Sequence, residues 1–348
     1  MTTYETIDIQ VLSGLEAVRK RPGMYIGGTD ASAMHVLAWE LLDHAVTEHE
    51  QGFARCIRVR IDGTWLEVED DGRGIPVDPM PKTGVPALEF LCTDMIGLHG
   101  RGIPVVSALS SELDAEVWRD GRHHRLRVSR GRALGPLEDL GPTSRRGTRI
   151  SFTPDFDLID RAVWNRERIA DRLRQLAASH PELTLMLGAD AFRCPEGLAD
   201  HVRHRAGGAR LLHEPIRIRG AHDDIAVEVA LVWTDADRVD ATSIVNRWAP
   251  RSGRHFDGLS DAMFEAIRRL APDRLAGVYR SAFHEVVDRG LVAAIRLDMR
   301  EPHLTSATHG HLANPAAHDA VAAVVTEPLY AALAGDARLR DLFARMPR

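Results

Sequence analysis

The sequence predicts an α+β protein with two domains. Segments with period-two hydrophobicity, which indicate strands, are mixed with segments of period 3.6, which indicate helices. They lack the regular strand–helix–strand repeat of a doubly wound sheet. The pattern breaks near Gly207-Gly208, so we expect domains over residues 1–205 and 206–348. The length of 348 residues suits two ordinary domains.

The composition is that of a soluble globular protein, with 44% hydrophobic and 27% charged residues. The net charge of -6 gives no overall attraction to DNA or to anionic membranes. Cys56, Cys92 and Cys194 are far apart, which argues against a disulfide framework or a cysteine zinc site and fits a reducing cytoplasm. There is no run of about 18 apolar residues, so no membrane span is expected. The first ten residues do not have the pattern of a signal peptide.

Residues 30–51 have the spacing of a long helix. Leu37, Leu41 and Ala45 fall on one apolar face. Five polar side chains recur at helical spacing and share one stripe: Glu40, Asp43, His44, Thr47 and Glu48. We expect such a stripe to face solvent unless a site lies beside it.

A β-hairpin follows this helix. Residues 57–61 and 66–70 alternate in hydrophobicity around Asp62-Gly63, which is a turn signal. Asp70 falls in phase with the apolar Leu66 and Val68, so its carboxylate is expected on the core side of the strand. A buried carboxylate needs a partner, and a ligand can supply one.

Further elements continue the mixed pattern. A second hairpin is expected over residues 115–119 and 123–128, around Asp120-Gly121. The sequence also predicts strands at 148–152, 225–233 and 291–297, and helices at 160–178, 261–270 and 316–334.

A glycine-rich loop, GLHGRG, covers Gly97–Gly102 and leads into a predicted helix at Ile103-Pro104. Proline suits the first turn of a helix. Backbone N–H groups of such a loop at a helix N-terminus bind phosphate without any side chain. This loop is therefore a candidate phosphate site.

Four segments taken in order resemble the ATPase region of the bacterial DNA gyrase B subunit and its topoisomerase IV paralogue, of the GHKL superfamily. They are LEAVRKRPGMYIG (Leu15–Gly27), DDGRGIP (Asp70–Pro76), GLHGRG (Gly97–Gly102) and the pair Gly147-Thr148. One DxGxG is weak evidence, whereas the ordered set is specific. The resemblance implies a GHKL (Bergerat) ATP-binding sandwich followed by a transducer-like α/β domain, with ATP or another adenine nucleotide as ligand.

The resemblance also assigns roles to residues. Asp70 accepts a hydrogen bond from the adenine amino group, and Gly72 and Gly74 let the backbone approach the base. Glu40 takes the position of the general base that activates the attacking water. The remaining positions form the adenine pocket (Ile75, Pro76 and Thr148), the phosphate loop (Gly97, Leu98, His99, Gly100, Arg101 and Gly102) and the pocket rim (Asp43, Glu48 and Arg73).

The chain departs from the family at several positions. His44 stands where the family has the asparagine that ligates Mg²⁺, and imidazole is a poor ligand for this ion. His309 stands in the position of the lysine that reaches the γ-phosphate, with Ala307 in the glutamine position, and no lysine follows Lys82. The segment between Glu89 and Gly97 is shorter than the family's ATP lid. These losses predict slow or absent ATP hydrolysis.

The resulting expectation is an adenine-nucleotide-binding protein of the cytoplasm, with impaired turnover and without the cleavage domains of a topoisomerase. By resemblance it forms a homodimer through an arm at Thr2–Gln10, and gyrase subunits are possible partners. Arg122–Arg130 gives only a weak indication of DNA contact.

Three alternatives stay open. One is a nucleotide-free scaffold or regulator of gyrase, and another is an authentic slow Mg²⁺-dependent ATPase. The third is a repurposed metal-dependent enzyme that uses Glu40 and His44, which are one helical turn apart, with His99 nearby in the fold.

Overall fold

The computed structural model describes residues 14–95, 102–275, 289–305 and 310–344. The chain divides into two compact units, each of which has its own sheet. The first comprises Met1–Leu173 and Leu183–Phe192, and the second comprises Arg174–Glu182 and Arg193–Arg348. Helix α6 (Arg166–Ser179) contributes residues to both units.

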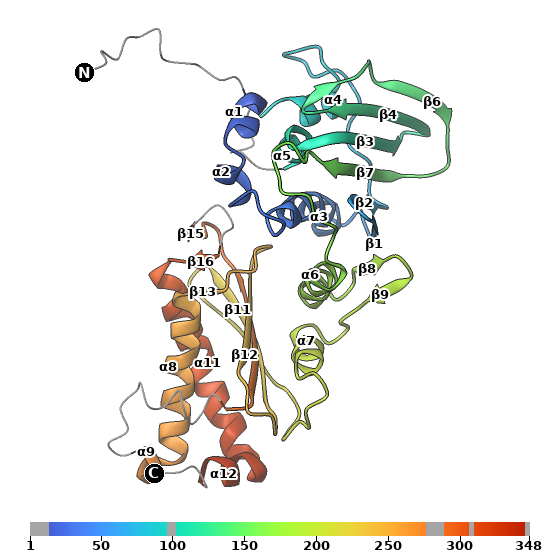
Figure 1. Cartoon of the computed structure of the whole chain (residues 1–348). Coiled ribbons are helices and arrows are strands. Elements are labelled where there is room, and N and C mark those ends of the chain that lie inside the picture. Colours follow the sequence, from blue (N-terminus) through green and yellow to red (C-terminus); the bar gives the residue numbers. More distant parts are fainter. Residues whose placement is uncertain (1–13, 96–101, 276–288, 306–309, 345–348) are drawn as a thin grey trace, which may run out of the picture. The chain divides into compact units, whose positions relative to one another are not determined.

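The described part of the first unit is built on a nine-stranded sheet (Figure 1). Its strands run in the order β5-β4-β3-β7-β2-β1-β8-β9, and β6 pairs with β4. They are β1 (Cys56–Asp62), β2 (Trp65–Asp70), β3 (Ser110–Arg119), β4 (Arg122–Ser129), β5 (Arg132–Ala133), β6 (Glu138–Pro142), β7 (Gly147–Pro154), β8 (Thr184–Leu187) and β9 (Asp190–Phe192).

Both predicted hairpins are present. Strands β1 and β2 pair antiparallel from Ile57↔Asp70 to Asp62↔Trp65. Strands β3 and β4 turn at Asp120-Gly121, whose φ angles of 51° and 75° are both positive. An Asp-Gly pair in this conformation forms the tight turn whose twist matches antiparallel strands. Local turn chemistry therefore determines where the second hairpin closes, whereas the first closes over Gly63-Thr64, between the paired Asp62 and Trp65 and one residue after the predicted Asp62-Gly63.

Helices of this unit pack on the sheet or on one another, and some of them carry part of the candidate site. They are α1 (Gly14–Lys20), α2 (Gly23–Ile26), α3 (Met34–Glu50), α4 (Ala87–Thr93), α5 (Ile103–Ala108) and α6. Helix α3 packs against α5, β2 and β7, which places its polar stripe beside the end of β2. The expected helix at 103–104 is α5, with Pro104 in its first turn.

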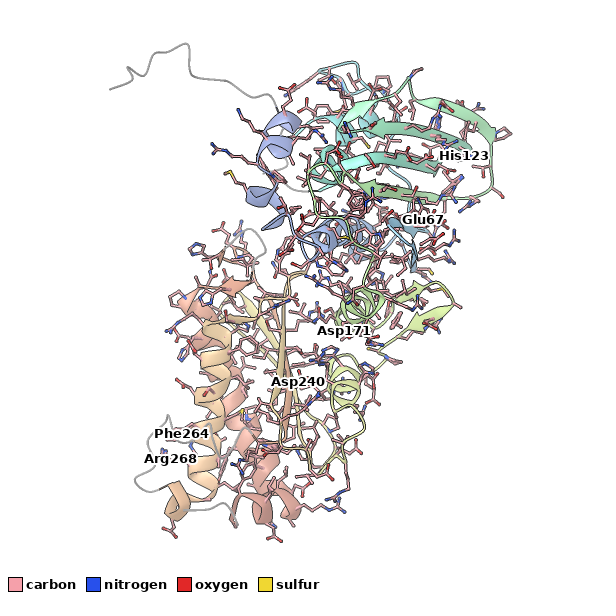
Figure 2. The ribbon with its side chains drawn as sticks, viewed as in Figure 1. Glu67, His123, Asp171, Asp240, Phe264 and Arg268 are labelled. Carbon is pink, nitrogen blue, oxygen red and sulfur yellow. The ribbon has the colours of Figure 1, made fainter. Side chains whose placement is uncertain are left out.

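Charged side chains project from the sheet strands β2, β3 and β7. Arg149 of β7 forms ion pairs with Glu116 of β3 and with Glu67 of β2. His123 of β4, which is labelled in Figure 2, bonds to Glu116 and stacks on Trp118, with ring centroids 5.3 Å apart. Burial raises the pKa of Glu67, while neighbouring arginines oppose that rise. These pairs satisfy charges that are largely removed from water.

The helix expected over residues 160–178 is wrong at its start, because α6 begins only at Arg166. The preceding residues bond to other parts of the unit. The Asp160 amide donates to the Thr29 carbonyl at 2.8 Å, and the Trp164 amide and indole donate to the carbonyls of Gly63 and Thr64 at 3.2 and 3.0 Å. These tertiary hydrogen bonds outweigh the local helical pattern.

The second unit is a four-stranded sheet with helices on both faces (Figure 1). The strand order is β10-β11-β14-β12, with β10 (Ile216–His222), β11 (Ile225–Trp233), β12 (Asp240–Val245) and β14 (Leu291–Asp298). Helices α8 (Arg254–Leu270) and α11 (Pro315–Gly335) lie on one face of the sheet and α7 (Leu198–Arg205) lies on the other. The short helix α9 (Pro272–Leu275) follows α8, and α12 (Ala337–Ala344) follows α11. A small sheet joins β13 (Ser252–Gly253), β16 (His311–Leu312) and β15 (Leu304–Thr305).

Two boundaries in this unit differ from the sequence expectation. The main segment of the second unit begins at Arg193, before α7 and earlier than the expected boundary at residue 205. The reason is that α7 packs on β10, β11 and β14. Helix α8 begins at Arg254 rather than residue 261, directly after Gly253 with its φ of 142°. The strand predicted over residues 225–233 is β11, and those predicted at 148–152 and 291–297 lie within β7 and β14.

Among the described residues, no single helix is long and apolar enough to cross a membrane. Helices α11 and α12 pass that test only as a pair, bent by 98°.

Gly258 is expected to be required for the packing of α8 on α11. A Cβ atom there would lie 2.4 Å from the His318 carbonyl oxygen. We predict that Gly258→Ala lowers the free energy of unfolding by about 1–3 kcal/mol, because overpacking forces the helices apart. The matched control is Gly335→Ala on α11, where a Cβ atom meets nothing within 4 Å. Chemical denaturation of both variants measures the effect, and equal stability would contradict it.

Candidate functional site

Strand β2 ends in a buried carboxylate. The Asp70 residue is 3% exposed, as its phase in the sequence predicts. Its Oδ1 accepts the N–H of Gly72 at 2.8 Å. The pKa of Asp70 is raised to about 7, mainly by burial and also by the negative charges of Glu48 and Asp71, while backbone hydrogen bonds from Gly72 and Thr148 oppose the rise. The group is thus a buried hydrogen-bond acceptor whose ionised form is costly to maintain.

Three glycines make room for this carboxylate and its strand. A Cβ atom on Gly72 would lie 2.7 Å from the Asp70 Oδ1 atom. Gly74 has a φ of 80°, and a Cβ there would lie 2.9 Å from the Trp118 carbonyl oxygen. Gly147 has a φ of 115°, and a Cβ there would lie 2.0 Å from the Asp70 carbonyl oxygen. Only glycine fits such close approaches between backbones.

Thr148 lies beside this strand end, as expected. Its hydroxyl accepts the amide N–H of Ile75 at 3.1 Å, and both residues are buried. Pro76, the next residue, is exposed. The loop that carries the DDGRGIP motif is therefore bonded to β7 as well as to β2.

The pair expected between Arg73 and Glu48 is present. The guanidinium donates to both carboxylate oxygens, with Nε–Oε2 and Nη2–Oε1 distances of 3.1 and 2.8 Å. It also lies over the Phe53 ring, 3.7 Å from the centroid. Hydrogen bonding from Arg73 holds the pKa of Glu48 below its usual value. This bidentate pair fixes α3 against the glycine motif.

Asp43, expected at the rim, is instead buried and points toward α6. Its Oδ1 atom lies 3.1 Å from the Nη2 atom of Arg172, a buried arginine. The Arg172 guanidinium also lies 6.0 Å from the ring centroid of Trp39. Sequence reasoning did not single out Arg172, because only the packing of α6 on α3 brings the two charges together.

Glu40, in the general-base position, is also buried rather than on a solvent-facing stripe, with 6% of the residue exposed. Its Oε2 atom accepts the amide N–H of Gly102 at 2.8 Å. Gly102, with a φ of 86°, directly precedes α5. The other expected loop residues, Gly97, Leu98, His99, Gly100 and Arg101, lie outside the described residues, as do Ala307 and His309.

His44 is half-buried on α3, one turn after Glu40. A carboxylate and an imidazole do not form the oxygen-rich ligand set that Mg²⁺ prefers. Among the described residues, no group of three or more His, Cys, Asp or Glu side chains is placed to hold a metal ion. His99, which the metal-dependent alternative places near Glu40 and His44, lies outside the described residues, so this alternative stays a prediction.

A second arginine that sequence reasoning missed supports the glycine motif. The Arg119 Nη1 atom donates to the Gly74 carbonyl at 2.7 Å. Arg119 ends β3, directly before the Asp120-Gly121 turn. The sequence around Arg119 does not indicate that its side chain bonds to Gly74, which is 45 residues away in the sequence.

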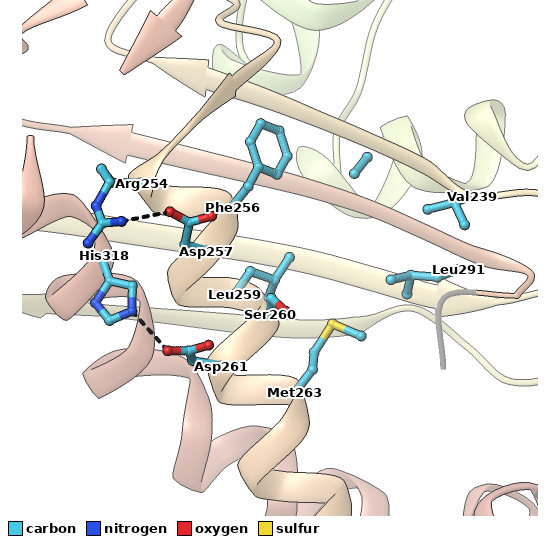
Figure 3. A pocket seen from close by; sticks show the side chains of 11 residues that line it. Val239, Arg254, Phe256, Asp257, Leu259, Ser260, Asp261, Met263, Leu291 and His318 are labelled. Atoms are coloured by element: carbon cyan, nitrogen blue, oxygen red, sulfur yellow. Dashed lines mark hydrogen bonds and ion pairs between the residues drawn. The ribbon is translucent and has the colours of Figure 1, made fainter. Parts of the chain in front are cut away.

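The first unit also has a cavity away from Asp70. It measures about 1090 Å³ and is lined in part by Gly14, Arg19, Asp94, Arg130 and Leu134. A cavity of about 530 Å³ lies in the second unit (Figure 3). There Arg254 pairs with Asp257, and His318 bonds to Asp261 at 3.0 Å. The candidate site is therefore identified by its chemistry and not by the size of a cavity.

Comparisons with known proteins agree on the type of fold. The family model for DNA gyrase B matches residues 197–345. The model for the histidine kinase-, DNA gyrase B- and HSP90-like ATPase matches residues 29–158. The second match covers Asp70, Gly72, Gly74, Thr148 and Glu40.

Two curated relatives illustrate the similarity. The chain is 36% identical to the DNA gyrase B subunit of Thermus thermophilus, over 97% of this chain and 57% of that protein. It is 34% identical to the type 2 topoisomerase B subunit of Aquifex aeolicus, over 89% of this chain and 42% of that protein. The chain thus spans about half the length of these relatives.

Two solved structures are also similar. One is the 43K ATPase domain of Thermus thermophilus gyrase B in complex with an aminocoumarin, with a TM-score of 0.77, 34% identity and coverage of 95% of this chain and 93% of that one. The other is the gyrase B subunit of Myxococcus xanthus, with a TM-score of 0.80 at 24% identity and coverage of 96% and 99%, which supports the fold alone.

The burial of Asp70 predicts a pH dependence of stability. Its pKa is raised from 3.8 to about 7, so the folded chain disfavours the ionised form. This group therefore favours folding most below its unfolded pKa, and that contribution is lost as the pH rises from 4 to 7. We predict that Asp70→Asn gains stability relative to the native chain over this interval, on the order of a few kcal/mol. Denaturation of both proteins at a series of pH values measures the difference, and parallel curves would contradict it.

Proposed function

We propose, from the premise that the chain belongs to the DNA gyrase B family of ATPase domains, that it binds an adenine nucleotide through Asp70 and hydrolyses ATP weakly or not at all. The observation that carries the proposal is the buried Asp70 carboxylate at the end of β2, with Gly72 packed against it. A buried acceptor of this kind selects a base that offers an amino group, because a base without one leaves it unpaired.

The elements around Asp70 support nucleotide binding over a purely structural role. Gly72, Gly74 and Gly147 each lie where a side chain would collide with the backbone or with a carboxylate. Thr148 and Arg119 hold the motif from β7 and β3. Gly72 approaches the Asp70 carboxylate and Gly147 approaches the Asp70 carbonyl oxygen, so the loop packs tightly around the group that we propose as the adenine contact.

Weak turnover follows from the chemistry at the phosphate end. His44 supplies a nitrogen where Mg²⁺ needs oxygen, and His309 replaces the family's lysine. A fixed cation at the transferred phosphoryl group supplies a large part of this catalysis, and neutral histidine supplies little at pH 7. The short segment between Glu89 and Gly97 also gives a smaller lid.

We further propose that the chain forms a homodimer in the cytoplasm, with gyrase subunits as candidate partners. The expected arm, Thr2–Gln10, lies outside the described residues. The named relatives are subunits of gyrase and type 2 topoisomerase. Contact with DNA is a weaker proposal, since the arginines of β4 are engaged locally, with Arg122 on Asp139 and Arg125 on Asp114.

A nucleotide-free scaffold or regulator of gyrase is the second candidate. It is favoured by the near-complete burial of Asp70 and by the position of two cavities away from this residue. A scaffold of this kind would bind no nucleotide, so a direct binding measurement separates the two candidates.

We predict that a non-hydrolysable ATP analogue binds the purified chain in isothermal titration and that Asp70→Asn weakens this binding at least about tenfold. The matched control is Asp71→Asn. The Asp71 carboxylate accepts the amides of Arg55 and Cys56 at 2.7 and 2.9 Å, so its hydrogen bonds go to β1.

Binding that survives Asp70→Asn, or that Asp71→Asn abolishes equally, would contradict the assigned adenine contact. No heat with the native chain would favour the scaffold. A turnover assay on the same samples completes the test. Phosphate release no faster than that of Glu40→Ala supports a binding protein, and clearly faster release by the native chain supports the slow ATPase.

A further inference from the structure

Helix α8 of the second unit begins with a buried histidine that forms no hydrogen bond. His255, in the first turn of α8, is 0% exposed, and neither of its ring nitrogens has a hydrogen-bond partner among the described residues. The other buried histidines of the described residues each form at least one hydrogen bond: His35, His180, His201 and His213. A buried ring with two unpaired nitrogens favours the neutral form, because a charge there is both desolvated and unpaired.

No carboxylate is bonded to the His255 ring in the part of the chain that the structure describes. On its own helix, Arg254 and Asp257 are exposed and pair with each other at 3.1 Å. Strand β16 brings His311 near, whereas β13 and β15 contribute no ionisable side chain. From α11, the ring of His318 is bonded to two aspartates. The other helices packed on α8, namely α9 and α12, lie at its far end (Figure 1).

A proton on His255 is therefore disfavoured while the ring is buried. Burial, and then the neighbouring His311, lower the pKa of His255 to about 4. The first turn of a helix is also the positive end of the helix dipole, where a cation is unfavourable. A protonated ring needs water, which it reaches only when the start of α8 separates from the elements that cover it.

The small sheet beside His255 is held by few backbone pairs. Strands β13 and β16 pair only at Ser252↔His311 and Gly253↔Leu312. A Cβ atom on Gly253 would lie 2.4 Å from the Leu312 carbonyl oxygen, so β13 is pressed against β16 directly before α8. By contrast, β11 and β14 pair along their whole lengths. Elements with few backbone pairs open at a lower free energy than the core of a domain.

We propose that His255 is a pH-sensitive switch, whose neutral form holds the start of α8 against β13 and β16 and whose protonation releases this small sheet from the second unit. Release takes up a proton, because the pKa of the ring is about 4 when it is buried and returns to its ordinary value of 6.5 in water. The closed state is therefore fully favoured above pH 6.5 and is lost as the pH falls from 6.5 toward 4. The switch does not depend on nucleotide binding.

The test measures hydrogen exchange of the whole chain at pH 7 and pH 5, with each rate corrected for the intrinsic effect of pH on exchange. Peptides covering residues 251–256 and 310–313 report on the small sheet. A peptide covering residues 226–232 reports on β11, which lies inside the four-stranded sheet and opens only when the unit unfolds.

Three variants separate the histidines. His255→Phe keeps a ring of similar shape but cannot take up a proton. His311→Gln removes the nearest ionisable neighbour of His255. His222→Gln, at an exposed position at the end of β10, is the matched control for the loss of a histidine.

We expect the protection of the small sheet in the native chain to fall about twentyfold from pH 7 to pH 5, as linkage to the lowered pKa of one histidine requires. At pH 5 the β11 peptide stays more protected than the small sheet. His255→Phe shows the same protection of the small sheet at both pH values. His311→Gln and His222→Gln keep most of the fall.

Protection that does not change with pH in the native chain overturns the proposal without any variant. A fall that persists in folded His255→Phe and disappears in His311→Gln assigns the effect to the wrong histidine and also overturns it. Equal protection of the small sheet and β11 at pH 5 shows unfolding of the whole unit and contradicts local release. If thermal melting shows that His255→Phe is misfolded, His255→Leu takes its place.

Discussion

The burial of the Asp70 carboxylate is the constraint from which the rest of the candidate site follows. A carboxylate in a residue that is only 3% exposed must be bonded, and the backbone around it is arranged accordingly. Gly72 brings its amide to the carboxylate, and Gly147 lets β7 pass directly against the strand end. The pKa of about 7 expresses the cost of this arrangement, which a ligand that donates to the carboxylate offsets.

Helix α3 organises the other side of the site through three acidic residues with different partners. Glu48 binds Arg73 at the rim, Asp43 binds Arg172 of α6, and Glu40 binds the Gly102 amide before α5. The glycine motif, the helix shared by both compact units and the start of α5 are therefore all fixed to one helix.

Sequence reasoning succeeded where local chemistry decides the structure. The Asp120-Gly121 turn, the phase of Asp70 in its strand and the proline in the first turn of α5 are all properties of neighbouring residues. It failed where distant segments decide. The late start of α6 depends on the bonds of Trp164 to the first hairpin, and the burial of Asp43 depends on Arg172. Neither contact leaves a pattern in the sequence near the residue concerned.

The most direct measurement of the central claim is the affinity of the native chain for adenosine compared with inosine at pH 8. Inosine presents a carbonyl oxygen where adenosine presents an amino group, and the ionised Asp70 carboxylate can only accept. The account predicts that adenosine binds and that inosine binds at least about a hundredfold more weakly. Equal affinity for the two nucleosides would contradict recognition of adenine by Asp70.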